Sequence, residues 1–215
     1  MQNARFALYL LVALVPSLVL HEYAHALAAD RLGDPTPRRW GRLTLNPRPL
    51  VDAFGTVILP GLLLILVASG YFVPVFAYAK PLPHDPTYLR NRQRDDAWVQ
   101  LSGPVVSLAL AVISGIVLRV LSGELGLFVF AILYVNVILC VFNLMPIPGL
   151  DGARLLAPFL PPRAREVYRN LDQYLALFML LVFFLLGGLL LGIVSALSSG
   201  LCRLVTGGAT LCGIF

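Results

Sequence analysis

The stretch His21-Glu22-Tyr23-Ala24-His25 lies inside an apolar run, Phe6 to Ala29, that holds no other ionic side chain and no other histidine. At helical spacing the two histidines fall one turn apart on the same face, so both imidazoles can reach one Zn²⁺. Glu22 then lies beside the position that such a metal leaves open for water. Ionisable groups in an apolar segment are costly unless they are paired or bind a metal. The stretch therefore predicts a metal-dependent chemical site.

The same stretch has two simpler interpretations. An HExxH pattern can arise by chance on an ordinary helix. The run also resembles a secretory signal peptide, with Arg5 as its basic end and Ala26-Leu27-Ala28 as a small-residue cleavage site. N-terminal sequencing of the mature protein would distinguish that case. We favour the metal site because the rest of the chain supplies the features that HExxH alone lacks.

The composition is that of a polytopic membrane protein. Of 215 residues, 59% are hydrophobic and only 13% are charged, which is too apolar for an ordinary soluble domain. The net charge of +5 would suggest nucleic acid as the partner of a soluble protein. Here the basic residues lie in short loops between apolar runs, where they set the orientation in the lipid bilayer. We therefore expect an integral membrane protein with no nucleic-acid partner. A bacterial cell membrane is the expected location.

The chain is organised by five apolar segments: Phe6 to Ala29, Phe54 to Tyr78, Trp98 to Leu121, Leu125 to Met145 and Tyr174 to Leu197. Four have the length of plain spanning helices, about 20 residues. The second is interrupted by prolines and glycines, which predicts a broken or re-entrant segment. The expected fold is all-α and polytopic, with about four spanning helices in one membrane-embedded domain over residues 1–215. Its core would cover about residues 6–160, followed by a C-terminal helix at 172–199 and a tail.

The distribution of positive charge depends on whether the second segment crosses the membrane. If all five segments cross, seven of the sixteen Lys and Arg residues lie on one side of the membrane and nine on the other, so the charges favour neither orientation. If the second segment dips in and returns, thirteen lie on one side, against Arg5, Arg119 and Arg203 on the other. The positive-inside rule then makes the thirteen cytoplasmic and the N-terminus external. We prefer this arrangement, in which the active site faces the cytoplasmic side.

The loops carry weaker signals. Between Asp30 and Asp52, the alternation over Arg39 to Pro47 predicts a short β-hairpin at the membrane face, although an ordinary basic loop fits equally well. The charged loop from Lys80 to Asp96 is predicted to be a solvated connector, and its His84 is expected to lie away from the site.

The three cysteines lack metal-ligand spacing, so none is predicted to bind zinc. Cys140 lies in an apolar run and is predicted to pack there. Cys202 and Cys212 could pair if their end of the chain faces an oxidising compartment.

A candidate third ligand follows the fourth apolar segment. The stretch Phe142-Asn143-Leu144-Met145-Pro146-Ile147-Pro148-Gly149-Leu150-Asp151-Gly152 holds prolines and a glycine that must unwind any helix. The freed backbone groups need a polar cavity, which places Asp151 near water. Taken alone, Asp151 could simply cap a helix that starts at Gly152. With His21 and His25 it completes two imidazoles and one carboxylate, a set of three protein ligands that suits a catalytic zinc.

These motifs together resemble the site-2 protease family of intramembrane zinc metalloproteases. The resemblance rests on HEYAH at 21–25, GRLTLNP at 41–47, GT at 55–56 with Pro60, AKP at 79–81, GP at 103–104 and FNLMPIPGLDG at 142–152. It implies that His21, His25 and Asp151 bind one Zn²⁺ per chain. It further implies that Glu22 is the general base and that Asn143 is a polar group near the scissile carbonyl.

The chain departs from the family pattern at two positions. The family's GPxxN motif usually has Asn where this chain has Ser107. The subgroup's NPxxHxDP motif corresponds to residues 46–53, where Leu50 stands in place of the histidine. Neither position is an implied metal ligand, so the departures concern substrate positioning rather than the metal site.

The resemblance implies hydrolysis of peptide bonds in single-pass transmembrane proteins, within or near the bilayer. A transmembrane substrate must first unwind, and the Arg42 to Leu45 stretch could hold it by β-addition, a role that Leu43→Pro would remove. The alternatives are a catalytically inactive metal-binding homologue that acts as a scaffold or chaperone, and a small transporter with a zinc-stabilised core. The implied base and all three implied ligands are present, and the sequence shows no internal repeat, so neither alternative is preferred. The sequence leaves the oligomeric state open.

Overall fold

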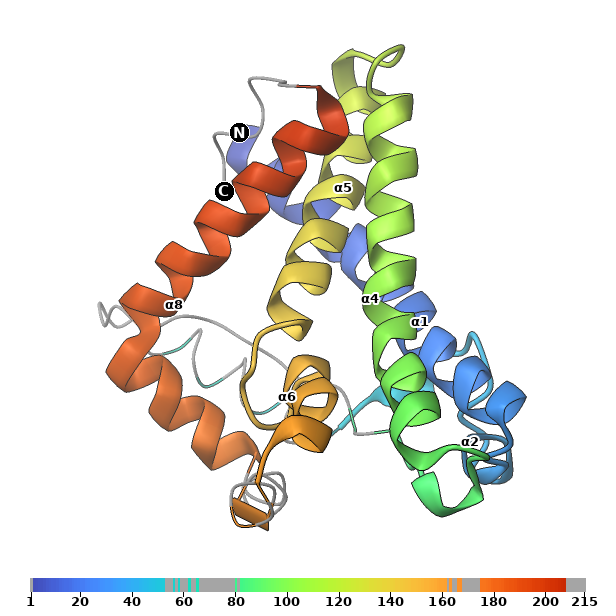
Figure 1. Cartoon of the computed structure of the whole chain (residues 1–215). Helices are drawn as coiled ribbons and strands as arrows, with labels where there is room; N and C mark the ends of the chain where they lie inside the picture. The colour runs from blue at the N-terminus through green and yellow to red at the C-terminus, as the bar shows by residue number, and fades with distance from the viewer. Residues whose placement is uncertain are drawn as a thin grey trace.

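The chain forms a bundle of long helices in a computed structural model (Figure 1). The structure describes residues 2–52, 56, 58, 62, 65, 80, 82–161, 163, 166, 167 and 175–207. Within these ranges the long helices are α1 (Gln2–Leu32), α4 (Arg92–Val117), α5 (Gly123–Asn143) and α8 (Leu175–Thr206). The integral membrane class predicted from the composition agrees with this all-helical architecture.

Shorter helical elements connect the long ones. They are α2 (Thr36–Arg39), η1 (Arg48–Leu50), η3 (Pro86–Tyr88), α6 (Asp151–Leu156) and η4 (Ala157–Phe159). In Figure 1, α2 and α6 lie at one end of the bundle, whereas the turn between α4 and α5 lies at the other. The short elements therefore gather at the end to which α1 delivers its histidines.

Three of the described helices are long and apolar enough to cross a membrane, over Leu8–Leu32, Arg92–Val117 and Gly123–Asn143. They match the first, third and fourth of the predicted apolar segments. The fifth predicted segment falls within α8, whose described side chains include the apolar stretch Gly192–Thr206. The second segment, predicted to break or re-enter, falls almost entirely outside the described residues.

Residue chemistry sets the helix ends nearest the site. α1 ends before Gly33, which has a φ of 114° that favours glycine, and the Asp34 amide donates back to the Ala29 carbonyl at 2.9 Å. α4 begins after Asn91, whose side chain accepts a hydrogen bond from the Arg94 amide. Both ends are thus fixed by local hydrogen bonds, which positions the first turn of α4 beside the last turns of α1.

The core of the bundle is built by α1, α4 and α5, with α8 packed on α5. Aromatic rings of Phe6 on α1 and Phe130 on α5 stack with centroids 5.9 Å apart. Cys202 on α8 is fully buried in the same cluster. The core also holds a polar contact between helices, because the fully buried Asn136 of α5 donates from Nδ2 to Ser17 Oγ of α1 at 2.9 Å.

The contacts show that α1 and α4 run antiparallel. Tyr9, early in α1, donates to Glu124 at the start of α5 at 2.9 Å, whereas His25 contacts Val99 in the first turns of α4. α1 therefore ends at the same end of the bundle at which α4 begins. A backbone hydrogen bond of 2.9 Å from the Lys80 amide to the Leu50 carbonyl joins the two flanks of the intervening segment.

This arrangement agrees with the preferred charge distribution. The chain leaves α1 and enters α4 at the same end of the bundle. The basic residues of the loops after α1 and before α4 consequently lie at the histidine end. Arg119 follows α4 at the opposite end, where the N-terminal half of α1 also lies (Figure 1).

The β-hairpin predicted over Arg39 to Pro47 is wrong, because the described residues 30–52 contain no strand. Local turns satisfy the backbone instead: the Arg42 amide donates to the Pro37 carbonyl at 2.8 Å, and Asn46 Oδ1 accepts from the Arg48 amide at 3.0 Å. Gly41, at a φ of 66°, turns the chain away from an extended path. The structure thus shows no strand edge for β-addition at residues 42–45.

Candidate metal centre

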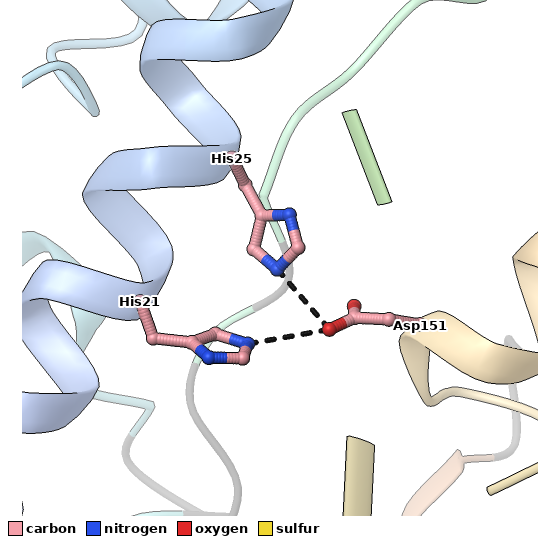
Figure 2. A group of neighbouring side chains, drawn as sticks. All are labelled: His21, His25 and Asp151. Carbon is pink, nitrogen blue, oxygen red and sulfur yellow. Dashed lines mark hydrogen bonds and ion pairs between the residues drawn. The ribbon is translucent and has the colours of Figure 1, made fainter. Parts of the chain in front are cut away.

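Three side chains from two distant segments converge at the end of the bundle that holds α6. His21 and His25 project from one face of α1 toward Asp151 of α6, as Figure 2 shows. The distances from Asp151 Oδ2 are 3.2 Å to His21 Nε2 and 3.1 Å to His25 Nε2. Among the described residues this is the group of His, Cys, Asp and Glu whose ligand atoms lie close enough to hold a metal ion. The predicted convergence of the two histidines and the aspartate is therefore present.

The loop before α6 delivers the carboxylate. Gly149 has a φ of 92°, and Met145, Ile147 and Leu150 bury their side chains against α5 and α8. Gly152 permits the close turn, since a Cβ there would lie 2.2 Å from the Leu144 carbonyl oxygen. α6 starts at Asp151 itself and has no side-chain cap. The alternative in which Asp151 only caps a helix is therefore wrong.

The second ring nitrogens of the histidines are held by α4. His25 Nδ1 lies 2.7 Å from the Val99 carbonyl oxygen, and His21 Nδ1 lies 2.9 Å from Ser107 Oγ. Gly103 lies between these two contacts, where a Cβ would come within 2.2 Å of His25 Nε2 and 2.6 Å of His21 Nε2. The imidazoles thus pack against the backbone of α4 at Gly103, and the hydrogen bonds of their Nδ1 atoms orient them.

The donor set fits a divalent metal. A carbonyl oxygen can only accept, so His25 Nδ1 carries the proton that bonds to Val99, and in the neutral ring Nε2 is left with a lone pair. That lone pair faces a carboxylate oxygen of Asp151, an arrangement that needs a cation or a shared proton between them. Ligands about 2.1 Å from a tetrahedral zinc are about 3.4 Å apart. The observed separations of 3.1 and 3.2 Å are close to that spacing.

The two histidines of the group are buried, whereas Asp151 is partly accessible to water. His21 is 1% exposed and His25 5%, whereas the Asp151 side chain is 15% exposed. Burial acts to raise the pKa of Asp151, but the influence of the two neighbouring imidazoles outweighs it, so the pKa lies below its usual value. The carboxylate is therefore ionised and ready to bind a cation, on the side from which water can reach it.

The two other predicted catalytic residues lie outside this convergent group. Glu22 adjoins His21 on α1 and is half-buried. The buried guanidinium of Arg42 lies near the Glu22 carboxylate. Burial lowers the pKa of Arg42, and the negative charge of Glu22 partly offsets this effect. Arg42 also donates to the carbonyls of Pro49 and Lys80. Asn143, at the end of α5, donates from Nδ2 to the Leu139 carbonyl of its own helix at 2.9 Å.

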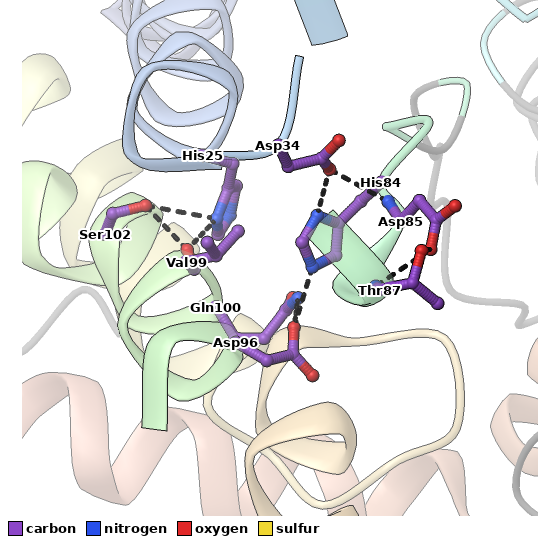
Figure 3. Close-up of polar contacts among 9 residues, drawn as sticks. All are labelled: His25, Asp34, His84, Asp85, Thr87, Asp96, Val99, Gln100 and Ser102. Carbon is purple, nitrogen blue, oxygen red and sulfur yellow. Dashed lines mark hydrogen bonds and ion pairs between the residues drawn. The ribbon is translucent and has the colours of Figure 1, made fainter. Parts of the chain in front are cut away.

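A second polar cluster, which the sequence analysis missed, lies beside the centre (Figure 3). His84 bridges two carboxylates, with Nδ1 2.8 Å from Asp34 Oδ2 and Nε2 2.9 Å from Asp96 Oδ1. Asp34 is fully buried and also accepts from the backbone amides of Thr36 and Asp85. This cluster, Asp34–His84–Asp96, ties the end of α1 to the start of α4, so the loop around His84 is not a plain solvated connector. Its three residues are dispersed along the chain, and no spacing could have signalled it.

Hydrogen bonding sets the ionisation of this cluster. Burial alone would lower the pKa of His84, but the hydrogen bonds and charges of Asp96 and Asp34 outweigh it, so the pKa of His84 is raised. Burial would likewise raise the pKa of Asp34, but hydrogen bonds from Thr36, Asp85 and His84 lower it. Both shifts favour the ion-paired form of the cluster.

The cysteines take no part in the metal centre. Cys140 is a buried free thiol, as its apolar surroundings predicted. Cys202 is disulfide-bonded, whereas Cys212 lies outside the described residues.

Comparisons with known proteins identify similar metalloproteases. The sequence model of peptidase family M50 matches residues 119–187, a range that includes Asn143 and Asp151 but neither histidine. "Putative zinc metalloprotease YwhC" of Bacillus subtilis is 35% identical over 178 residues, covering 77% of this chain and 75% of the relative. "Putative zinc metalloprotease Rip2" of Mycobacterium tuberculosis is 32% identical over 174 residues, covering 78% of this chain and 63% of the relative. No solved structure matches.

The fold and the site define a helical membrane protein with a metalloprotease-type ligand set. The chain belongs to peptidase family M50, the site-2 protease family of zinc metalloproteases. The resemblance drawn from the motifs is thereby confirmed.

Proposed function

We propose that this protein is an intramembrane zinc metalloprotease that hydrolyses peptide bonds of single-pass transmembrane proteins. The observation that carries the proposal is the approach of one Asp151 oxygen to both Nε2 atoms within an apolar helix bundle. The names of the relatives support zinc as the metal. The alternative of an inactive scaffold is not favoured, because the base and all three ligands are present.

Each residue has a distinct part in the proposed reaction. His21, His25 and Asp151 would hold one Zn²⁺ per chain, and Val99 and Ser107 would orient the two imidazoles. A bound zinc ion supplies Lewis acidity and lowers the pKa of coordinated water to about 7. Glu22 accepts a proton from the attacking water and returns it to the leaving amine.

Two further features concern the substrate. Asn143 is proposed to donate a hydrogen bond to the developing oxyanion of the substrate. To do so, its Nδ2 must release the hydrogen bond that it now donates to the Leu139 carbonyl. A transmembrane helix shields its peptide bonds with its own hydrogen bonds, so a substrate must unwind locally before cleavage. The partly exposed Asp151 marks the side on which an unwound segment and water can meet the site.

We further propose that the histidine end of the bundle faces the cytoplasm and that the N-terminus is external. Thirteen of the sixteen Lys and Arg residues belong to loops assigned to that end. The disulfide bond of Cys202 supports the assignment, since Cys202 lies toward the opposite end of the bundle, where an oxidising compartment is expected. Labelling single introduced cysteines at positions 40 and 122 with an impermeant maleimide in intact cells should modify only position 122.

The decisive test of the proposed activity is Glu22→Gln. Purified protein in detergent should retain one equivalent of zinc and lose cleavage of a test transmembrane substrate by about 100-fold or more, because the amide cannot accept the proton. Glu124→Gln makes the same change at the opposite end of the bundle and should leave cleavage intact. Cleavage by Glu22→Gln at the wild-type rate would show that the base is misassigned.

A further inference from the structure

A single face of α4 supports both imidazoles. Val99, Gly103 and Ser107 are spaced by four residues on α4, and they oppose His21 and His25, spaced by four on the antiparallel α1. Carbonyl groups in a helix point toward its C-terminus, whereas side chains tilt toward its N-terminus. The Val99 carbonyl and the Ser107 side chain therefore both point toward the level of Gly103. This explains how residues two turns apart reach adjacent rings.

Ser107 is fully buried, at 0% exposure, and its Oγ lies 2.9 Å from His21 Nδ1. A hydroxyl can accept the proton of Nδ1, which leaves the Nε2 lone pair directed at the point shared with His25 and Asp151. The Val99 carbonyl does the same for His25. The two rings meet at an interplanar angle of 75° with centroids 4.9 Å apart, so neither fixes the other by stacking.

We propose that Ser107 is a positioning residue of the metal centre, which holds His21 in the tautomer and orientation needed to bind the metal. This inference rests on the proposed function, because it assumes that His21 is a zinc ligand. It assigns a role to the position at which the chain departs from the family's GPxxN pattern. The departure then affects the seating of the metal rather than the positioning of substrate.

The test is the zinc affinity of three variants, measured on metal-free protein in detergent by competition with a chromogenic chelator. Ser107→Ala should weaken zinc binding by about 10–100-fold, the usual effect of losing such a partner. Ser107→Thr keeps the hydroxyl and should remain within about threefold of wild type. Ser114→Ala is the matched control, since Ser114 is a buried serine of the same helix, 6% exposed, and lies two turns beyond Ser107.

A second readout does not depend on whether the threonine variant folds. In protein loaded with Co²⁺ in place of zinc, Ser107→Ala should shift the visible absorption bands, because the bands report the ligand geometry. Ser114→Ala should leave them unchanged. Wild-type zinc affinity and unshifted bands in Ser107→Ala would overturn the proposal, and so would equal losses in Ser107→Ala and Ser114→Ala.

The outcome can be separated from that of the proposed activity. The readouts are metal affinity and Co²⁺ spectra, so a Glu22→Gln variant that still cleaves would refute the catalytic assignment and leave the role of Ser107 intact. A Ser107→Ala variant with wild-type affinity would do the reverse. A wild-type protein that binds no zinc would overturn both.

Discussion

The molecule holds two histidine clusters that use the same residue types in opposite arrangements. In the metal centre, two imidazoles approach one oxygen of Asp151, at 3.1 and 3.2 Å. In the Asp34–His84–Asp96 cluster, one imidazole lies between two carboxylates, which bind its opposite nitrogens at 2.8 and 2.9 Å. Figures 2 and 3 show the difference: the first group points at a common atom, and the second forms a chain.

The comparison shows that convergence of lone pairs, and not residue type, decides whether such a group suits a metal. Every nitrogen of His84 faces a carboxylate that can accept its proton, so the protonated ring satisfies the cluster. In the metal centre, His25 Nδ1 already uses its proton on a carbonyl, and the lone pair of the other nitrogen faces an acceptor. Protein groups alone satisfy the Asp34–His84–Asp96 cluster, whereas the group around Asp151 needs a cation or a shared proton between the imidazole lone pairs and the carboxylate.

The largest expected difference comes from the same substitution made in each cluster. Asp151→Asn should reduce zinc affinity by more than the roughly 100-fold that marks the upper range for an outer-shell partner, because it removes a charged ligand. Cleavage should fall to background. Asp34→Asn should leave one zinc per chain bound. Metal analysis of both purified variants checks this, and loss of zinc in Asp34→Asn alone would show that the two clusters have been assigned the wrong way round.

Gly103→Ala should have the next largest effect. The new Cβ would lie 2.2 Å from His25 Nε2, so the imidazole has to rotate away from Asp151. We expect zinc affinity to fall by about 10-fold or more. In the metal-free protein the clash with the two buried imidazoles should offset the roughly 1 kcal/mol by which alanine favours a helix over glycine. Chelator competition and thermal melting measure the two effects separately.

Gly188→Ala provides the control for this variant. Gly188 lies in α8 with nothing within 4 Å of an added Cβ, so the change should leave zinc affinity untouched. The interpretation of Gly103 as a steric requirement fails if both alanine variants bind zinc as tightly as the wild type.

The convergence of His21, His25 and Asp151 was predictable, partly from local signals and partly from the resemblance to the site-2 protease family. His21 and His25 are one turn apart in a helix, and Asp151 follows a proline-rich break that cannot lie in lipid. The preferred charge distribution is compatible with the antiparallel arrangement of α1 and α4. A pattern within one helical turn or one loop can be interpreted without knowledge of the tertiary contacts.

Features that depend on tertiary contacts were not predictable. The alternation over Arg39 to Pro47 indicated strands, but Arg42 is buried and donates to two loop carbonyls, which holds the chain in turns. In the sequence, Ser107 was only a departure from the family's GPxxN pattern. Its proposed role as a positioning residue depends on its contact with His21, which the structure shows. The Asp34–His84–Asp96 cluster joins three segments with no common spacing, so pattern analysis placed His84 in solvent.

The smallest predicted effect is on the pH dependence of stability, and it belongs to the second cluster. His84 has a raised pKa in the folded protein, so its stabilising contribution is complete below about pH 6.5 and is lost as pH rises through the raised value. Asp34, with a lowered pKa, contributes above about pH 3.8 and loses that contribution only in stronger acid. Stability should therefore decline as the pH rises above about 6.5.

His84→Gln tests this sign. Two carboxylates would then face a neutral amide, which should cost about 3 kcal/mol, since removing one partner of a buried pair leaves the other charges uncompensated. For a chain of this size each kcal/mol corresponds to about 2–4 °C in melting temperature. The wild type should lose part of its advantage over His84→Gln between pH 6 and pH 9, with zinc stoichiometry equal in both. If the stability difference between the wild type and His84→Gln grew with pH, His84 would be neutral in the folded protein. The two clusters would then differ less in ionisation than their geometry indicates.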